Sequence, residues 1–474
     1  MIIIGVQSQC YSLQPQKIIN FVIQLTTPEK YAKINRNWSY IKEKTIMKQL
    51  KLALIGCGDR GSCYMHYLDN HPEHFKLVAI ADPLPEKRQY FIDNYGVPAE
   101  GVYDDYKKLL SKEKLADIVM ICTQDKMHYE PAMMAIEKGY DLLLEKPISP
   151  DPKECFDIAD AAIAKGVKVL VCHVLRYTPF YKAIKKFIDK GRLGKLMNIN
   201  HTEGVGNVHM SHSYVRGPWR RTDEAAPMIL AKCCHDTDLL QWFVDEPCSK
   251  VHSFGTRSYF REENAPEGAP ARCLDGCPHK DTCYYYAPSL YKLPTAEVQH
   301  FKAVVAGHFD PTPEEVDEAL KTSQYGRCVY KCDNDVVDHQ ITSFTFGNDV
   351  QATLTMSAFN KGGRVTTFMG TKGELRADME KNTLEFYSFE TLETTIIYKP
   401  EEAMDQTIAG GHGGGDLGIM ADLYEYVANN NPSSSISDIG ISSMSYLMCF
   451  AAELSRETNT VVDMKDYMYN LQSK

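Results

Sequence analysis

A Gly-x-Gly-x-x-Gly motif begins at Gly56, directly after an apolar segment with the character of a buried strand. The first glycine permits a tight turn, the second leaves room for a pyrophosphate, and the third lets the next helix pack closely. Asp82 ends the following apolar segment, and an acid about 20 residues after the glycines is the one that binds a ribose diol. The motif predicts a dinucleotide site, with an ordinary glycine turn as the alternative. The cofactor contacts predicted here are Gly56, Gly58, Asp59, Arg60, Gly61 and Asp82.

A lysine stands where another strand of the same sheet is expected to end, in the triplet Glu145-Lys146-Pro147. A lysine beside a dinucleotide can hold or deprotonate a substrate hydroxyl, and the proline fixes the backbone after it. A surface lysine on a loop is the alternative. Thr123 and Gln124 end a neighbouring predicted strand and are expected at the same edge, because ligands bind at the carboxyl ends of such strands.

A third candidate for chemistry is His235, which shares one face of a predicted helix with Lys232 and Asp238. An imidazole there could orient a substrate or relay a proton. Lys232 could take part of the base role, since two lysines in one pocket lower each other's pKa. Alternatively, His235 only positions the substrate and Lys232 binds an anionic group.

Polar and aromatic residues further along the chain are candidates for the substrate pocket. Trp219 could stack on a sugar face, with the histidines of its run, His209 and His212, and Arg216 donating to hydroxyls, or it could latch onto the core. His412 stands in a glycine-rich run, which is either a loop over the site or a helix entrance capped by Asp416. The residues predicted to contact the substrate are His212, Trp219, Asp238 and His412.

Cysteines number 15, and several lie inside predicted core elements, which indicates reduced thiols in a cytoplasmic protein. Four of them, Cys273, Cys277, Cys283 and Cys328, fall in a segment with little core of its own. Four thiolates there could form a tetrahedral, structural zinc site, with Cys328 preferred over Cys332 as the fourth ligand. Reduced structural cysteines and disulfides are the alternatives.

Composition indicates a protein with large hydrophobic cores, since 44% of its 474 residues are hydrophobic and 24% are charged. The length suggests about three domains. The net charge of −10 disfavours nucleic acid and anionic membrane surfaces as partners. No apolar run reaches the roughly 18 residues that a membrane span needs.

The elements that must position these residues follow two patterns. Between residues 47 and 172, strands and helices alternate, which predicts an α/β, Rossmann-type domain with a doubly wound parallel sheet. Residues 173–456 predict an α+β domain with a large, mainly antiparallel open sheet. A cysteine-rich insertion at 260–335 interrupts that sheet, and 457–474 form a C-terminal tail. The strands expected in the second domain are 195–203, 250–257, 340–346, 351–358 and 364–370.

Residues 1–46 do not fit this organisation. They lack the basic start of a signal peptide, and Met47 leads directly into the first predicted strand. Met47 is therefore expected to be the natural start of the chain. A real N-terminal extension that packs on the surface is the alternative.

These motifs together resemble the Gfo/Idh/MocA family of NAD(P)-dependent oxidoreductases, named for glucose–fructose oxidoreductase and inositol dehydrogenase. The resemblance implies that the substrate lies between the two domains and that Lys146 touches both the nicotinamide ribose and the reacting hydroxyl. It adds His128, Glu145 and Arg176 to the expected cofactor contacts. The family has an acid four residues before its catalytic histidine, but Ala231 stands there in this chain. The matching motifs are the glycine motif, Ala81-Asp82-Pro83, Thr123 with His128, Gly139, Glu145-Lys146-Pro147, His173 with Arg176-Tyr177, Gly191-Arg-Leu-Gly194 and Gly370-Thr-Lys-Gly373-Glu374.

The expected activity is hydride transfer between NAD and a secondary hydroxyl of a sugar, glycoside or cyclic polyol. Lys146 would transfer the proton, assisted by His235. Asp82 favours NAD over NADP, because its carboxylate would repel a 2′-phosphate. One alternative is a nucleotide-binding sensor without turnover, which the missing acid at Ala231 supports. Another is an enzyme that holds NAD tightly and modifies glycosides by transient oxidation. The open sheet also predicts a homo-oligomer.

Overall fold

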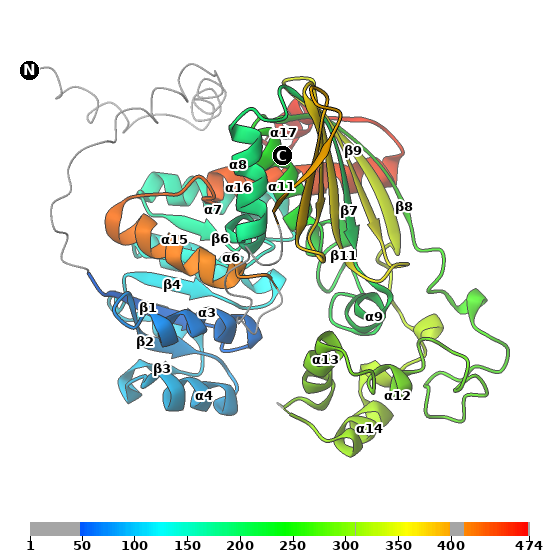
Figure 1. Ribbon diagram of the computed structural model, residues 1–474. Helices are drawn as coiled ribbons and strands as arrows, with labels where there is room; N and C mark the ends of the chain where they lie inside the picture. Colours follow the sequence, from blue (N-terminus) through cyan, green and yellow to red (C-terminus); the bar gives the residue numbers. More distant parts are fainter. Residues whose placement is uncertain (1–47, 309, 399–411, 473–474) are drawn as a thin grey trace, which may run out of the picture. The chain divides into compact units, whose positions relative to one another are not determined.

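The computed structural model describes residues 48–308, 310–398 and 412–472 (Figure 1). The expectation for residues 1–46 lies outside the described residues. Within the three described ranges, no helix combines the length and apolar content that crossing a bilayer requires.

Six parallel strands form the first sheet, in the order β3-β2-β1-β4-β5-β6, and confirm the predicted Rossmann fold (Figure 1). The central strands are almost wholly apolar, as strands covered on both faces must be. Helix α4 begins with Pro85 and ends at Gly96, whose φ of 63° suits a helix terminus. The strands are β1 (Leu50–Ile55), β2 (Phe75–Ala81), β3 (Val102–Tyr103), β4 (Ile118–Ile121), β5 (Asp141–Leu144) and β6 (Val169–Val171). The helices are α3 (Asp59–Asn70), α4 (Pro85–Tyr95), α5 (Tyr106–Ser111), α6 (Tyr129–Glu137) and α7 (Pro152–Lys165).

A nine-stranded sheet forms the second layer, in the order β14-β13-β12-β11-β7-β10-β9-β8-β15 (Figure 1). β7 and β10 pair in parallel, and the other described neighbours pair antiparallel, so the sheet is mixed but mainly antiparallel, as predicted. Four strands, β12 to β15, were not predicted, because they are short and need the edge of a neighbouring strand to form. The strands are β7 (Leu196–Gly204), β8 (Cys248–Thr256), β9 (His339–Phe346), β10 (Gln351–Ser357), β11 (Gly363–Gly370), β12 (Gly373–Asp378), β13 (Thr383–Ser388), β14 (Thr394–Tyr398) and β15 (Val462–Asp463).

Helices cover one face of this sheet. α11 (Cys234–Val244) packs on β7 and β10, and α16 (Ile439–Thr458) packs on β8. The helix predicted across His235 is in fact two helices, because α10 (Met228–Ala231) ends before α11 begins. The C-terminal residues also differ from the predicted tail, since they form β15 and helix α17 (Met464–Gln472).

The chain returns to the Rossmann domain after the second sheet. Helix α15 (Gly415–Asn429) packs against α3 (Figure 1). Its residues Ile419, Met420 and Leu423 share a buried apolar cluster with β1 and α3. The segment that was predicted to belong to the second domain thus completes the core of the first.

The insertion between β8 and β9 has a small apolar core of its own. Leu290, Phe301, Leu320 and Tyr325 are among its buried members. An isolated bridge between Arg272 and Arg327 closes the two ends of the segment. Its helices are α12 (Ala287–Leu290), α13 (Ala296–Ala306) and α14 (Pro313–Thr322).

Candidate active site

The glycine turn between β1 and α3 has the shape that the motif predicted. Gly56 has a φ of 91°, and a Cβ built there would lie 2.6 Å from the carbonyl oxygen of Cys122. A Cβ on Gly61 would lie 2.8 Å from the Gly56 oxygen, whereas Gly58 faces open space. None of the described side chains caps the start of α3. Uncapped N–H groups beside such a turn suit an anion, so these residues fit a dinucleotide pyrophosphate.

Asp82 lies against this turn at the end of β2. Its Oδ2 accepts a hydrogen bond of 2.9 Å from the Cys57 N–H, and its Oδ1 accepts one of 2.9 Å from the Leu84 N–H. The carboxylate therefore joins the glycine turn to the start of α4. Carboxylate oxygens have further lone pairs, so Asp82 can still accept from a ribose diol at the predicted place.

Arg60 links the glycine turn to two other segments through buried acids. Its Nε lies 2.8 Å from Glu145 Oε1, and its Nη2 lies 2.6 Å from Asp416 Oδ1. Tyr64 Oη donates to the same Glu145 oxygen at 2.5 Å, and His412 Nδ1 lies 3.2 Å from Asp416 Oδ2. Burial opposes ionisation of Glu145, but the charges of Arg60 and Lys146 hold its pKa below its ordinary value. The guanidinium thus positions β5 and α15 around the turn.

His128 holds the backbone next to Lys146. Its ring is fully buried, with Nδ1 2.6 Å from the Pro147 oxygen and Nε2 3.0 Å from the Thr123 oxygen. Thr123 Oγ1 in turn donates to the Met127 oxygen at 3.0 Å, and Gln124 is exposed beside it. Two of the predicted cofactor contacts, His128 and Thr123, thus fix the backbone at the strand ends.

Lys146 and His235 are brought together between the two sheets. Lys146 Nζ donates to the Ala231 oxygen at 3.3 Å. His235 is buried, and its Nδ1 has no hydrogen-bond partner among the described residues. Its ring centroid lies 5.8 Å from that of His173 and 6.2 Å from that of His412. Burial, and then the Lys146 charge, lowers the pKa of His235 well below its ordinary value. A neutral imidazole with a buried, unpaired nitrogen suits a hydroxyl ligand.

Lys232 stands on a buried ionic network close to Ala231. Its Nζ lies 3.4 Å from Glu203 Oε1. Arg364 joins Glu203, at 2.8 Å, to Asp236, at 2.7 Å. Burial raises the pKa of Glu203, whereas at Asp236 the Arg364 charge and the His201 hydrogen bond together outweigh burial and lower the pKa of that carboxyl. Lys232 is therefore held beside Ala231 by a carboxylate from β7.

Arg176 and Asp238, predicted as cofactor and substrate contacts, bind each other instead. Arg176 Nε lies 2.6 Å from Asp238 Oδ2, and Nη2 donates to Oδ1 at 2.7 Å. Both residues are 1% exposed. This bidentate pair joins the end of the Rossmann domain to α11.

Two other predicted substrate residues make contacts within the protein. His212 stacks on Phe301 with ring centroids 3.9 Å apart, and its Nδ1 lies 2.8 Å from Tyr291 Oη, so it anchors the insertion. Trp219 Nε1 donates to Asp125 Oδ2 at 3.2 Å, which latches its segment to the Rossmann domain.

His209, one of the histidines of the donor-rich run, and Glu297, which the sequence did not single out, approach the lysines. Their side chains meet at 3.5 Å, between Nδ1 and Oε1. Burial lowers the pKa of His209 and raises that of Glu297, and the charge of Lys232 acts on both. His209 begins the histidine-rich run that ends at Trp219, which was a usable signal. Glu297 comes from α13 of the insertion, and no local pattern marks it.

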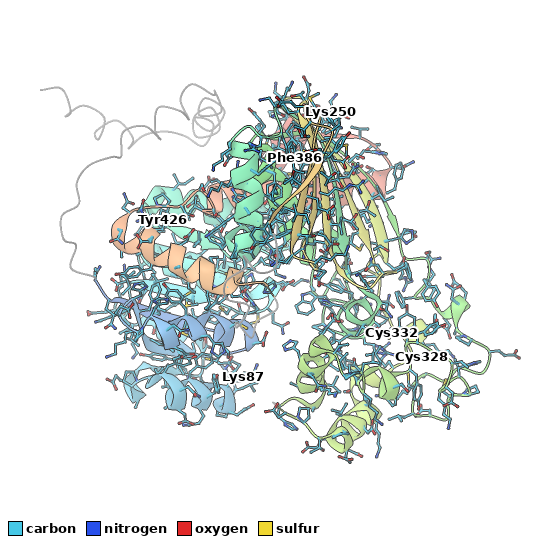
Figure 2. The ribbon with its side chains drawn as sticks, in the orientation of Figure 1. Lys87, Lys250, Cys328, Cys332, Phe386 and Tyr426 are labelled. Atoms are coloured by element: carbon cyan, nitrogen blue, oxygen red, sulfur yellow. The ribbon has the colours of Figure 1, made fainter. Side chains whose placement is uncertain are left out.

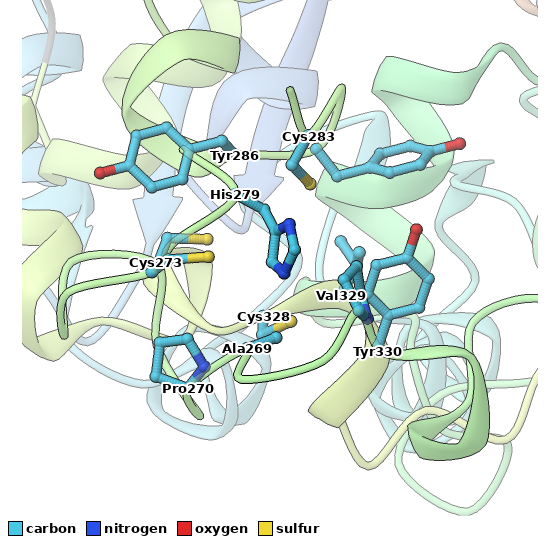
Figure 3. Close-up of a pocket in the computed structure, with 12 residues that line it drawn as sticks. Ala269, Pro270, Cys273, His279, Cys283, Tyr286, Cys328, Val329 and Tyr330 are labelled. Atoms are coloured by element: carbon cyan, nitrogen blue, oxygen red, sulfur yellow. The ribbon is translucent and has the colours of Figure 1, made fainter. Parts of the chain in front are cut away.

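The four predicted zinc ligands line one cavity of the insertion together with His279 (Figure 3). All four are free thiols, so the disulfide alternative is wrong for them. Cys332 lies beside Cys328 and donates to its carbonyl oxygen at 3.2 Å (Figure 2). Within the described residues, no three of the cavity sulfurs lie within 4.8 Å of one another, whereas zinc-bound sulfurs are about 3.8 Å apart. The thiols gather, but not at coordination spacing.

Comparison with known proteins identifies the family. Residues 50–173 match the family described as "Oxidoreductase family, NAD-binding Rossmann fold", and residues 181–271 match the "GFO/IDH/MocA C-terminal domain". The chain belongs to the Gfo/Idh/MocA oxidoreductase family. The expected family and the enzyme class, an NAD(P)-dependent oxidoreductase, are confirmed at this level.

Relatives within this family cover different shares of the chain. The Bacillus subtilis protein YteT is 24% identical over 394 residues, which are 78% of this chain and 88% of YteT. An inositol 2-dehydrogenase/D-chiro-inositol 3-dehydrogenase of Lactiplantibacillus plantarum is 28% identical over 45% of this chain and 58% of its own. Levoglucosan dehydrogenase with NADH and levoglucosan shares the fold, with a TM-score of 0.65, 16% identity, and coverage of 88% of this chain and 100% of its own.

Proposed function

We propose that the enzyme transfers hydride between NAD and a secondary hydroxyl or ketone of a sugar, glycoside or cyclic polyol. The observation that carries the proposal is the place of Lys146. Glu145, next to it, pairs with Arg60 of the glycine turn, while Lys146 Nζ reaches Ala231 beside His235. A proton-accepting amine thus stands between the cofactor turn and a histidine with an unpaired nitrogen.

Each side chain has a separate role in the proposed reaction. NAD supplies the hydride acceptor when it is bound. Lys146, as a neutral amine, takes the proton of the alcohol and returns it in the reverse direction. His235 orients the same hydroxyl through Nδ1. Lys232, held by Glu203, binds a neighbouring hydroxyl or an anionic group of the substrate, and His209 and Glu297 face the part of the substrate furthest from the cofactor.

The substrate class is supported by relatives that act on ring alcohols, as the names inositol 2-dehydrogenase and levoglucosan dehydrogenase state. NAD is proposed over NADP because Asp82 lies where a 2′-phosphate would meet its carboxylate. Titration with NADH and NADPH tests this, and tighter NADPH binding would contradict it.

The test of the reaction is NADH formation with a panel of polyols that includes myo-inositol, levoglucosan and glucose. The wild-type enzyme should reduce NAD with at least one of them, and Lys146→Ala should not. Lys153→Ala is the matched control, because Lys153 is an exposed lysine of the same domain that pairs only with Asp157 among the described residues. Cofactor binding without turnover of any polyol would instead favour the sensor, which no observation on this chain other than Ala231 supports.

We also propose self-association through the uncovered face of the nine-stranded sheet. Phe254, Ile341 and Val365 are 59%, 52% and 47% exposed. The strand register places them in one row across β8, β9 and β11, with Thr355 and Thr202 between the last two. A sheet face that exposes large apolar side chains in one row suits an interface between copies. Light scattering of Ile341→Lys should report a smaller particle than wild type.

A zinc ion in the cysteine cavity remains a proposal, supported by four thiols and an imidazole around one cavity. Binding would have to draw the sulfurs together. Metal analysis of protein purified without chelator should give one zinc per chain, and Cys283→Ser should lose it.

The 14 described cysteines are free, which also supports the proposed cytoplasmic location.

A further inference from the structure

Three potential metal ligands meet at the corner between α3 and β2, at the opposite end of α3 from the glycine turn. They are His71, Glu73 and His74. His71 Nδ1 lies 3.5 Å from Glu73 Oε1, and His74 Nε2 lies 3.6 Å from the same oxygen. All three ligand atoms lie within 4.8 Å of one another. No other group of three His, Cys, Asp or Glu side chains in the described chain is this close.

The spacing distinguishes a metal site from a set of hydrogen bonds. An N–H···O hydrogen bond spans about 2.7–3.2 Å, and a contact of about 3.6 Å is not one. Ligand atoms about 2.05 Å from a tetrahedral zinc ion are about 3.3–3.4 Å apart. The two measured separations, 3.5 Å and 3.6 Å, are therefore long for hydrogen bonds but near the edge of a coordination tetrahedron.

The surrounding structure fixes the His74 ring before any ion binds. Tyr67 Oη lies 2.8 Å from His74 Nδ1, so the other ring nitrogen of His74 faces Glu73. The His74 ring also stacks on Tyr424 of α15, with centroids 3.9 Å apart. The backbone is held too, because the His74 N–H donates to the His71 oxygen at 3.1 Å. A hydrogen bond to the second ring nitrogen is the usual support of a metal-bound histidine.

We propose that His71, Glu73 and His74 bind a divalent transition metal of the zinc class, with water completing the coordination. Imidazole and carboxylate ligands suit zinc, nickel or copper rather than calcium or magnesium. The ion has a structural role: it fixes the α3–β2 corner, on which Tyr424 of α15 packs. This site is independent of the hydride transfer proposed above and of the cysteine cavity.

The experiment uses Co²⁺ as the probe, in full-length protein carrying Cys277→Ser and Cys283→Ser so that the insertion does not contribute. Titration should give one Co²⁺ per chain, with visible absorption typical of a tetrahedral site and without thiolate charge transfer. Glu73→Gln and His71→Asn should each weaken binding by at least tenfold. Tyr67→Phe should weaken it by about 10- to 100-fold, because it frees the His74 ring. His66→Asn is the matched control, because His66 is an exposed histidine on α3 that pairs with Asp69. This variant should bind Co²⁺ as the parent does.

Two results would overturn the proposal. One is an absence of stoichiometric Co²⁺ binding in the parent protein, which would leave the three residues as an ion pair only. The other is equal binding by the parent, Glu73→Gln and His71→Asn. Neither result bears on NAD reduction, which depends on residues at the other end of α3.

Discussion

The cofactor half and the substrate half of the site are built in different ways. In the cofactor half, Asp82 accepts a hydrogen bond from the glycine turn, and Arg60 of that turn pairs with Glu145. In the substrate half, Asp238 and His212 were predicted to face a ligand but are bound within the protein. A dinucleotide site is mainly a backbone shape, which local sequence determines. A substrate site is assembled from distant segments, so each side chain's role depends on neighbours that the sequence does not reveal.

The two halves also carry their charges differently. Arg60 in the cofactor half is shared between two carboxylates that stay ionised despite burial, Glu145 and Asp416. The substrate half instead contains buried imidazoles whose pKa values burial lowers, such as His173 and His235. The cofactor half therefore relies on ion pairs around Arg60, whereas the substrate half combines buried ion pairs with neutral imidazoles.

The largest expected effect is that of Lys146→Ala, which should impair catalysis but not cofactor binding. Lys146→Ala removes the proposed proton acceptor but leaves the glycine turn intact, so kcat should fall by roughly 10²–10⁴-fold. The dissociation constant for NADH should change by less than about threefold, since the turn supplies the pyrophosphate site. Steady-state kinetics and NADH fluorescence titration measure the two quantities.

Lys146→Arg sharpens this test, because it keeps a positive charge but cannot act as a neutral base. Activity of Lys146→Arg close to wild type would show that the lysine serves as a charge and not as a base. A large loss of NADH affinity in Lys146→Ala would mean that the two halves cannot be treated separately.

The second effect tests whether backbone shape defines the cofactor half. Gly56→Ala places a Cβ 2.6 Å from a carbonyl oxygen at a φ of 91°. It should cost roughly 2–5 kcal/mol of folding stability or abolish NADH binding, from the left-handed conformation and the clash together. Gly96→Ala is the matched control, because its φ is 63° but nothing lies within 4 Å of a Cβ there. It should cost only about 1–2 kcal/mol. If urea unfolding showed the same loss of stability for Gly56→Ala and Gly96→Ala, the close approach of the Gly56 Cβ position to Cys122 would not matter for stability.

The same contrast explains how much the sequence could predict. Strands β1 and β2 lie where apolar segments predicted them, and helices α4 and α7 each carry a clear end signal in the sequence. Strands β12 to β14 were missed because their apolar positions become buried only once β11 offers its edge.

Side-chain roles were harder to predict than elements. Arg176 and Asp238 carry the charges expected of site residues, and nothing in their spacing shows that they pair over 62 positions. Glu297 could not be found at all, since it reaches the lysines only when the insertion folds.

The third effect is a difference in acid sensitivity between the halves. Burial lowers the pKa of His173 to about 4, although Asp238 opposes the shift. In the unfolded chain His173 has a pKa of about 6.5, so as pH falls the unfolded state binds the proton before the folded state does. The folded state therefore loses stability as pH falls from about 6.5 to about 4. The loss between about pH 7.5 and about pH 5 is about 2 kcal/mol.

Urea unfolding of wild type and His173→Gln at these two pH values measures that contribution. The variant should lose about 2 kcal/mol less than wild type over the interval. In the cofactor half, the lowered pKa values of Glu145 and Asp416 give stability that is present above about pH 4 and lost only below it. Hydrogen exchange at pH 5 should accordingly show the substrate half opening before the glycine turn. If the glycine turn opened first, the proposed difference in acid sensitivity between the two halves would be wrong.

The smallest effect concerns Trp219, the one predicted substrate residue whose two roles can still be separated. If the ring is a latch, its bond to Asp125 is worth about 1 kcal/mol. Trp219→Phe and Asp125→Ala should then cost similar stability, and the double variant should cost little more than either, because both remove one interaction. A ring that stacks on the substrate would behave differently: Trp219→Leu would raise KM severalfold even in the Asp125→Ala background. Unchanged KM in that background would place Trp219 with Arg176 and His212, as residues that build the substrate half without touching what it binds.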